Sequence, residues 1–497
     1  MTNKKHSNMI KVRHTLILAI ACAMAVVACD DDESTTVPHA NVINGGGSGT
    51  ADTDTSATIS STTIEANRFV YEVLQTYYYW NTEIPNVDYR KQADTEEFFY
   101  DLLSTKDRFS YITSDVDEYE EEEQGNYTSL GWEFTLSYID TTSTDIVAIV
   151  NLVYDNTPAS RAGAKRGDII YTVNGTQLTK DNYYDLLYSG TSYTFGGYRV
   201  REAISYAMTK EAINISPVAM TKTFELEDGR QCGYMLFNEY KTTFDDEMLA
   251  ALSSLKAEGV EEMILDLRYN NGGYVSTGIK LNSALAPAAV VSGHEPMMYY
   301  EFNKTLQRSY PDYYSAEASM EYFTDTTGVN LDLDRVVILC GGGTYSSAEA
   351  TIWCLKPYMD VVTIGSTTGG KNSMMYLLTP SDFTNSYTGE AYYSSSIDNW
   401  LMAPIVAIYK NATGEAFDTS DGTGMDPDYE VSEYSGLTST GLKDLGDPEE
   451  NLIAAALEYL NTGSVSTNKA MERGLRTITS SVAEKPHLFV KPLPKTK

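Results

Sequence analysis

Two adjacent serines and a lysine are the strongest candidates for nucleophilic chemistry in this chain. The segment "GGGTYSSAEATIWCLKPYMDVVTIGSTTGGKN", residues 341–372, places Ser346 and Ser347 after a glycine run, at the expected start of a helix. A serine hydroxyl is a weak nucleophile near neutral pH and needs a base within hydrogen-bond reach. The residues alone leave open which serine is the nucleophile.

The base is more plausibly a lysine than a histidine. Four of the five histidines lie near the ends of the chain: His6, His14, His39 and His487. His294 falls in the expected core but has no matching acid at hand, which disfavours a Ser-His-Asp triad. A lysine can replace it when burial lowers its pKa from about 10.4 towards about 7 to 8. Lys371 fits this role, because the small residues "STTGG" before it let the backbone approach closely and add no charge.

Alternating helices and strands after residue 215 are expected to position these groups. Residues 245–256 predict a helix, "MILDL" a buried strand and "RYNNGG" a tight loop. A second unit consists of "RVVILC", "GGGT", a helix over 345–355 and the strand "VVTIG". Two such β-loop-helix units indicate an α/β layered core with a site at the strand ends. Neither glycine-rich loop matches a nucleotide-binding fingerprint.

Two smaller units precede this core. Apolar residues at helical spacing predict a small helical domain over residues 64–113. The order of strands, helix and turns over 130–187, including "SLGWEF" and "VYDNTPASRAGAKRGDIIYTVNG", resembles a PDZ domain. The resemblance implies that a peptide C-terminus adds as a strand beside a carboxylate-binding loop. That loop is Leu130, Gly131, Trp132 and Glu133, although Glu133 would weaken capture of a carboxylate. A PDZ fold that serves only as a spacer is the alternative.

The N-terminus predicts export and lipid anchoring. Residues 1–28 combine basic residues with the apolar run "TLILAIACAMAVVA", which is too short for a permanent span and typical of a signal peptide. The run ends in "VVAC", which resembles a bacterial lipobox with Cys29 as the lipidated residue; an ordinary signal peptide is the alternative. "DDDES" after Cys29 resembles the surface-export signal of Bacteroidetes lipoproteins. We therefore expect a lipid-anchored protein of the cell envelope, periplasmic or surface-facing, with residues 29–63 as a flexible tether.

Composition excludes several classes of function. The chain has 497 residues and a formal charge of −33, which becomes about −37 once residues 1–28 and their four basic side chains are removed. Such acidity makes nucleic acid an unlikely partner. The acidic run 115–124 lacks the spacing of a calcium loop and predicts a solvated face. Cys232, Cys340 and Cys354 form an odd set without metal spacing, so neither a disulfide scaffold nor a metal is predicted.

Three segments carry a family resemblance: "GTYSSAEATIWCLKPYMDVVTIGSTTGGK", "MILDLRYNNGGYV" and "GTGMDPDYEV". Together they resemble the C-terminal processing, or tail-specific, serine peptidases, over about residues 64–462. The resemblance assigns Ser346 as nucleophile and Lys371, 25 residues later, as base. It also implies an oxyanion hole made by the N–H of Ser347 and that of Gly272 or Gly273.

Two positions depart from the family pattern. Many members have a glutamine four residues after the lysine, where this chain has Met375, which leaves a dyad or an orienting role for Asn372 or Ser373. Tyr345 stands where the family has alanine and could narrow the pocket next to the nucleophile. Cys340 is also close enough in sequence to be considered as a nucleophile. Its place at the end of an apolar strand instead predicts that it is a small core residue.

The sequence thus predicts a multidomain α/β protein whose peptidase core is ClpP/crotonase-like. The expected units are a signal peptide (1–28), tether (29–63), N-terminal helical domain (64–118), PDZ domain (119–214), peptidase core (215–462) and C-terminal tail (463–497). The expected function is that of a serine endopeptidase without a cofactor, acting on protein or peptide substrates recognised through their C-termini. The alternative is a weak or inactive peptidase-fold lipoprotein that binds peptide or glycan.

Overall fold

The computed structural model describes residues 59–138, 144–325, 328–385, 388–466, 476–481 and 489–492. The predicted signal peptide, the lipidation residue Cys29 and most of the predicted tether lie outside the described residues. Across the described ranges, no helix has both the length and the apolar character needed to cross a membrane.

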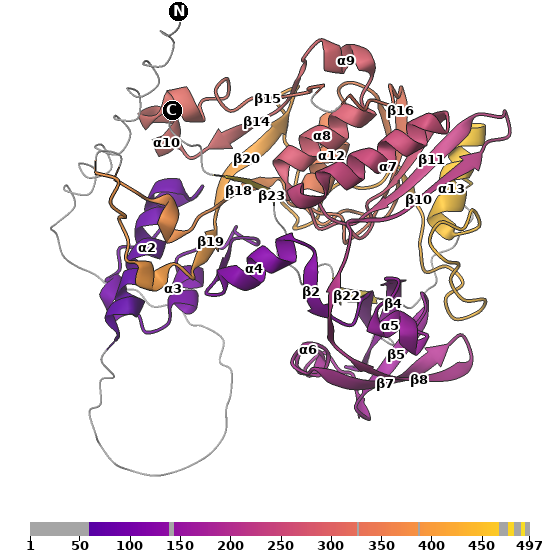
Figure 1. Cartoon of the computed structure of the whole chain (residues 1–497), viewed down its shortest axis with the longest axis horizontal. Helices are drawn as coiled ribbons and strands as arrows, with labels where there is room; N and C mark the ends of the chain where they lie inside the picture. The colour runs from indigo at the N-terminus through magenta and orange to yellow at the C-terminus, as the bar shows by residue number, and fades with distance from the viewer. Residues whose placement is uncertain are drawn as a thin grey trace, which may run out of the picture.

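A mostly parallel sheet is the centre of the α/β core (Figure 1). Its strands, in spatial order, are β10 (Val218–Glu225), β11 (Gln231–Phe237), β12 (Val260–Asp266), β16 (Arg335–Cys340), β17 (Asp360–Gly365) and β21 (Tyr429–Glu430). Only β10 pairs antiparallel within this order. The predicted strands "MILDL", "RVVILC" and "VVTIG" therefore lie side by side, as parallel β-loop-helix units require.

Helices cover both faces of this sheet. On one face lie α7 (Asp245–Ala257), α8 (Val275–Leu285) and α12 (Ser347–Leu355), and on the other lies α13 (Asn451–Thr462). Successive residues of β16 alternate between the two apolar clusters: Val336 packs with the first set and Val337 with α13. A strand buried on both faces has no polar side, which explains its continuous apolar run.

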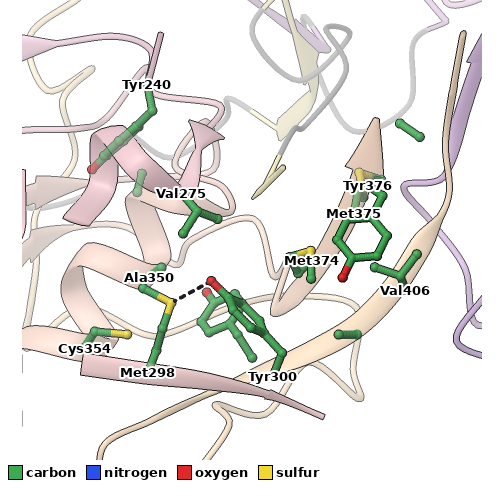
Figure 2. Close-up of a cluster of buried hydrophobic side chains, with 14 of the residues drawn as sticks. Tyr240, Val275, Met298, Tyr300, Ala350, Cys354, Met374, Met375, Tyr376 and Val406 are labelled. Carbon is green, nitrogen blue, oxygen red and sulfur yellow. Dashed lines mark hydrogen bonds between the residues drawn. The ribbon is translucent and has the colours of Figure 1, made fainter. Parts of the chain in front are cut away.

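A second sheet packs against α8 and α12. Its order is β13 (Gly273–Tyr274), β23 (Phe489–Pro492), β18 (Ser373–Leu377), β20 (Ile405–Asn411), β14 (Pro296–Phe302) and β15 (Glu321–Tyr322). Figure 2 shows Met374 and Met375 of β18 in the apolar cluster with Tyr300 of β14 and Ala350 and Cys354 of α12. The strand that follows Lys371 is thus fixed by buried apolar contacts.

The N-terminal helices share the hydrophobic core of the α/β unit. Ser60 caps the N-terminus of helix α2 (Ser61–Tyr77): its side chain accepts a hydrogen bond of 3.0 Å from the N–H of Thr63. The apolar face of α2, together with α3 (Thr95–Asp101), belongs to the same apolar cluster as α8 and α12. Residues 107–110, which follow α3, lie close to Lys371.

The PDZ domain has a sheet of its own, in the order β22-β3-β4-β5-β7-β8. The elements of this domain are β3 (Trp132–Tyr138), β4 (Ile146–Val153), α5 (Pro158–Ala162), β5 (Asp168–Val173), α6 (Tyr183–Tyr188), β7 (Ser192–Arg199) and β8 (Glu202–Thr209). The strand β22 (Arg476–Ser480) comes from the far end of the chain. The region predicted as a C-terminal tail therefore supplies β22 to this sheet and β23 to the core.

A buried charge network joins the PDZ domain to the core. Arg268 contacts the Glu450 carboxylate at 2.8 and 3.0 Å, and Arg166 of the PDZ domain contacts it at 3.3 Å. Burial alone would raise the pKa of Glu450, but the charges of Arg268 and Arg166 outweigh it and lower the pKa to about 2. Arg268 also pairs with Asp266 and Arg166 with Glu433, so replacing one member would leave the buried charges only partly compensated.

We expect Glu450→Gln to lower the free energy of unfolding by about 3 kcal/mol, measured by urea denaturation, because it removes the carboxylate that two buried arginines share and leaves them only partly compensated. Glu449→Gln removes an exposed ion pair with Lys443 and should change it by less than about 1 kcal/mol. The folded pKa of Glu450 lies below its ordinary 4.5, so its stabilisation is full above pH 4.5 and disappears as the pH falls towards 2. Equal effects of the two variants would contradict this account.

Candidate active site

Ser346 stands at the junction of a loop and helix α12, directly after the parallel strand β16 and its glycine run. Its backbone has φ 63° and ψ −114°, a region that non-glycine residues rarely occupy. Such strain persists only where the surrounding structure enforces it, and it is concentrated at functional sites. The side chain is fully buried.

Lys371 lies beside this serine. Its Nζ is 3.3 Å from the Ser346 Oγ and 3.0 Å from the backbone carbonyl of Ser373. Desolvation by burial lowers the pKa of Lys371 from 10.5 to about 7, against the opposing influence of Asp107 and Glu349. A neutral amine can donate to the Ser373 carbonyl and accept the Ser346 proton, so the geometry suits a general base.

The N-terminal segment 107–110, part of "DRFSYI", covers this pair. The Phe109 ring centroid lies 5.8 Å from the Lys371 Nζ, and the Arg108 guanidinium donates to the Gly369 carbonyl at 3.4 Å. Tyr345 packs edge-on against Phe109, with ring centroids 6.3 Å apart. Its ring lies so close to Gly369 that a Cβ there would meet it at 2.0 Å. Tyr345 therefore helps to enclose the site, and Phe109 contributes to the desolvation of Lys371.

Glu349 organises the loop around the pair and was not singled out by the sequence analysis as a site residue. Its buried carboxylate accepts backbone N–H groups from Ser346 at 2.9 Å, Gly370 at 2.9 Å and Lys371 at 2.8 Å, and the hydroxyl of Thr368. Burial raises the pKa of Glu349, and these hydrogen bonds oppose the rise. One side chain thus fixes the backbones of both Ser346 and Lys371. Its place three residues after Ser346 matches a capping box and could have revealed this role.

The predicted oxyanion donors come together at the first turn of α12. Ser347 is the first residue of that helix, where the helix leaves its N–H unsatisfied and the dipole favours negative charge. Its hydroxyl donates to the Gly273 carbonyl at 2.8 Å, which holds the glycine loop against the helix. The N–H of Gly272 instead donates to Asn270 at 2.9 Å, which leaves Gly273 as the better candidate of the two glycines. Gly273 has φ 132°, and a Cβ there would lie 2.2 Å from the Tyr240 carbonyl.

The group that orients the Lys371 amine is a backbone carbonyl, that of Ser373, rather than a side chain. Met375 is buried in the apolar cluster of Figure 2. The Asn372 amide donates to the Phe417 carbonyl at 2.9 Å, whereas the Ser373 carbonyl accepts from Lys371. Of the two orienting residues considered, only Ser373 contacts the lysine.

Other candidates are not brought to the site. His294 stacks on Tyr322, with centroids 4.7 Å apart, and its Nδ1 lies 2.9 Å from the Phe323 carbonyl. Cys340 is buried, and burial raises the pKa of its thiol to about 12, as expected of a core residue. Within the part of the chain that the structure describes, no His, Cys, Asp and Glu side chains cluster in a way that could hold a metal.

A cavity of about 1420 Å³ connects the PDZ domain with the core. Its walls include Leu130, Trp132 and Glu133 of the predicted carboxylate loop, and Asn271 and Tyr345 next to the catalytic pair. Gly131 has φ 78°, and a Cβ there would lie 2.2 Å from the Thr157 side chain. The structure thus places the predicted peptide-binding loop and the region of Ser346 on one continuous hollow.

Three protein-family models match the chain. Residues 231–431 match peptidase family S41, residues 65–111 the peptidase S41 N-terminal domain, and residues 149–192 a PDZ domain. A solved structure from Bacteroides fragilis, assigned to the S41 proteases, is 26% identical, with a TM-score of 0.61 over 79% of this chain and 96% of that one. The chain is therefore similar to peptidase family S41 in its fold and in the order of its matched regions.

Curated relatives match over shorter parts of the chain. A carboxyl-terminal-processing protease of Synechocystis is 27% identical over 180 residues, which are 36% of this chain and 36% of that protein. A carboxy-terminal-processing protease of Bartonella bacilliformis is 21% identical over 290 residues, 56% of this chain and 59% of that protein. The chain thus matches between about a third and three fifths of the length of these relatives.

The lowered pKa of Lys371 predicts a pH dependence for the Ser346 hydroxyl. The rate at which a fluorophosphonate probe labels Ser346 should rise as the pH increases through about 7, because Lys371 becomes neutral and able to accept the proton. Lys371→Arg should abolish this rise, since arginine stays charged. Lys356→Arg, at an exposed lysine just after α12, should keep it. A pH-independent rate in the unmodified chain would contradict the assignment.

Proposed function

We propose that this member of peptidase family S41 is a serine endopeptidase that cleaves protein substrates with Ser346 as nucleophile and Lys371 as general base. The observation that supports this most directly is the 3.3 Å contact between the Ser346 hydroxyl and a buried lysine amine whose pKa is lowered to about 7. A buried lysine carries a desolvation cost that a purely structural role would not explain.

The proposed reaction has two halves. Neutral Lys371 takes the Ser346 proton as Oγ attacks the substrate carbonyl, and the resulting oxyanion accepts N–H groups from Ser347 and Gly273. The C–N bond then breaks as the protonated lysine gives its proton to the leaving amine, which produces an acyl-enzyme and a new N-terminus. Water repeats the sequence on the ester, with Lys371 again as base, and releases the new C-terminus. Side chains and backbone N–H groups of the described core supply each of these steps.

The PDZ domain is proposed to capture the substrate near its C-terminus. An extended peptide can add to the edge of β3 and continue through the 1420 Å³ cavity towards Tyr345 and Ser346. On this path the PDZ domain would guide the substrate to Ser346 and would be more than a spacer. Its substrate is thus an unfolded or extended polypeptide.

Substitution of the pair tests this function. Ser346→Ala and Lys371→Ala should each lower kcat/KM on an unfolded protein substrate by at least about a thousandfold, because each removes a member of one catalytic unit. Ser439→Ala, at an exposed serine, should leave it unchanged. Fragment masses from mass spectrometry would report the cleavage sites. An unmodified chain that binds peptide without cleaving it, in every condition tried, would favour the binding-protein alternative.

The same chain is proposed to be anchored in the cell envelope through a lipid on Cys29, on the strength of the "VVAC" motif alone. Expression in a bacterial host with a labelled fatty acid should label the unmodified chain and shift it to the membrane fraction. Cys29→Ala should lose both label and membrane association, whereas Cys22→Ala, within the signal peptide, should keep them. Labelling of Cys29→Ala would show that the anchor lies elsewhere.

A further inference from the structure

Strands from the C-terminal end of the chain join two sheets, one in the PDZ domain and one in the core (Figure 1). Strand β22 pairs antiparallel with β3, from Arg476 opposite Tyr138 to Ser480 opposite Thr135. Strand β23 inserts between β13 and β18 and runs parallel to both. Two strands from the C-terminal end of the chain, β22 and β23, thus pair with the PDZ sheet and with the sheet next to Ser346 and Lys371.

The edge that β22 occupies is the one on which the PDZ domain is proposed to take its substrate. β22 runs towards the loop that precedes β3, which is the direction an antiparallel peptide ligand would take. At the loop, the N–H of Ser481 donates to the Phe134 carbonyl at 2.8 Å, and the N–H of Phe134 donates to the Ser481 Oγ at 2.9 Å. The Ser481 hydroxyl also donates to the buried Glu133 carboxylate.

Glu133 explains why an internal segment fits this edge. A ligand carboxylate beside a buried glutamate would meet like charge, whereas a serine hydroxyl supplies the proton that the glutamate accepts. The residue that weakens capture of a chain end therefore favours an internal segment with a hydroxyl at this position. Ser481 is such a residue, and it is buried.

Strand β23 lies between the two halves of the catalytic apparatus. Its partner β13 begins at Gly273, the proposed oxyanion donor, and its partner β18 begins two residues after Lys371. In the sheet order β13-β23-β18, the backbone of β23 fills the slot between them. An extended substrate that approached the catalytic pair along this slot would meet a strand already in place.

Charge also favours the segment as an occupant. Residues 476–492 contain three Lys or Arg and one Glu, a net charge of +2 in a chain of −33. The cavity that leads to the site is lined by four glutamates of α4 (Val116–Glu123): Glu118, Glu121, Glu122 and Glu123. The whole lining holds eight carboxylates against four basic side chains, so its summed field attracts a positively charged segment.

We propose that the described strands β22 and β23 together act as an intramolecular peptide ligand that keeps the peptidase latent, so that a substrate strand must displace them before Ser346 can act. The proposal rests on the proposed function for its catalytic consequence. The competing ligand is an extended polypeptide, neutral or basic, with a Ser or Thr hydroxyl that meets Glu133.

Binding in trans tests the ligand without any need for catalysis. The chain ended after Ser466 and carrying Ser346→Ala should bind a fluorescent synthetic peptide of residues 476–492, measured by anisotropy, whereas the full-length Ser346→Ala chain should bind it at least about tenfold more weakly because its own segment competes. The same peptide with Ser481→Asp should bind more weakly than the unmodified peptide. Equal binding to the two chains, or none to a shortened chain that is folded by circular dichroism, would overturn the proposal.

Activity tests the latency. The chain ended after Ser466 should cleave an unfolded protein with kcat/KM about tenfold or more above that of the full chain, because release of a competing segment raises the competent fraction. Ser481→Asp should raise kcat/KM in the full chain by placing a carboxylate against Glu133, whereas Ser464→Asp, at an exposed serine of the same region, should not. If the shortened chain does not fold, latency is tested by comparing kcat/KM of the full-length Ser481→Asp and Ser464→Asp variants. Equal activity of that pair would overturn latency.

The two proposals fail in different ways. Inactivity of every variant, with the peptide still bound in trans, would refute the peptidase function and leave the segment as a ligand. An active chain whose rate is unchanged by Ser481→Asp, and whose shortened form binds no peptide, would keep the peptidase and refute the latency.

Discussion

An uncharged lysine amine beside a serine hydroxyl requires a place from which water is excluded, and the rest of this structure serves that requirement. Burial lowers the pKa of Lys371 to about 7 even though the carboxylates of Asp107 and Glu349 act to raise it. The apolar cluster around β18 fixes the strand that follows the lysine, and Phe109 from the N-terminal region covers its amine. The helical region therefore belongs to the site as well as to the fold.

Backbone groups do most of the positioning. Glu349 accepts N–H groups from both Ser346 and Lys371, so the backbones of this proposed pair are tied to one carboxylate although they are 25 residues apart. Gly273 can approach Tyr240 closely because it has no side chain, and the Ser347 hydroxyl holds its carbonyl. The departure from the family pattern at Met375 is compatible with this scheme, because the backbone carbonyl of Ser373 accepts a hydrogen bond from the lysine.

Strand addition links the two halves of the molecule. An unpaired sheet edge attracts extended peptide, whether from another molecule or from the same chain. In this protein the edge of β3 and the slot between β13 and β18 both take strands from the C-terminal segment. The same backbone chemistry that would recognise a substrate can thus regulate access to it, and the buried ion network at Glu450 holds the two halves in a fixed relation.

The sequence by itself determined the α/β units, the PDZ order and the Ser346–Lys371 spacing, because local hydrophobic periodicity and glycine-rich loops are written in short segments. It did not distinguish Gly272 from Gly273, show what orients Lys371, or reveal Phe109 as its cover, because these depend on contacts between residues far apart in the chain. The paths of β22 and β23 were equally hidden: a short polar segment such as "RTITS" carries no sign of the strand it will pair with. Only the tertiary structure decides that pairing, since a strand edge is completed by whichever segment the fold brings to it.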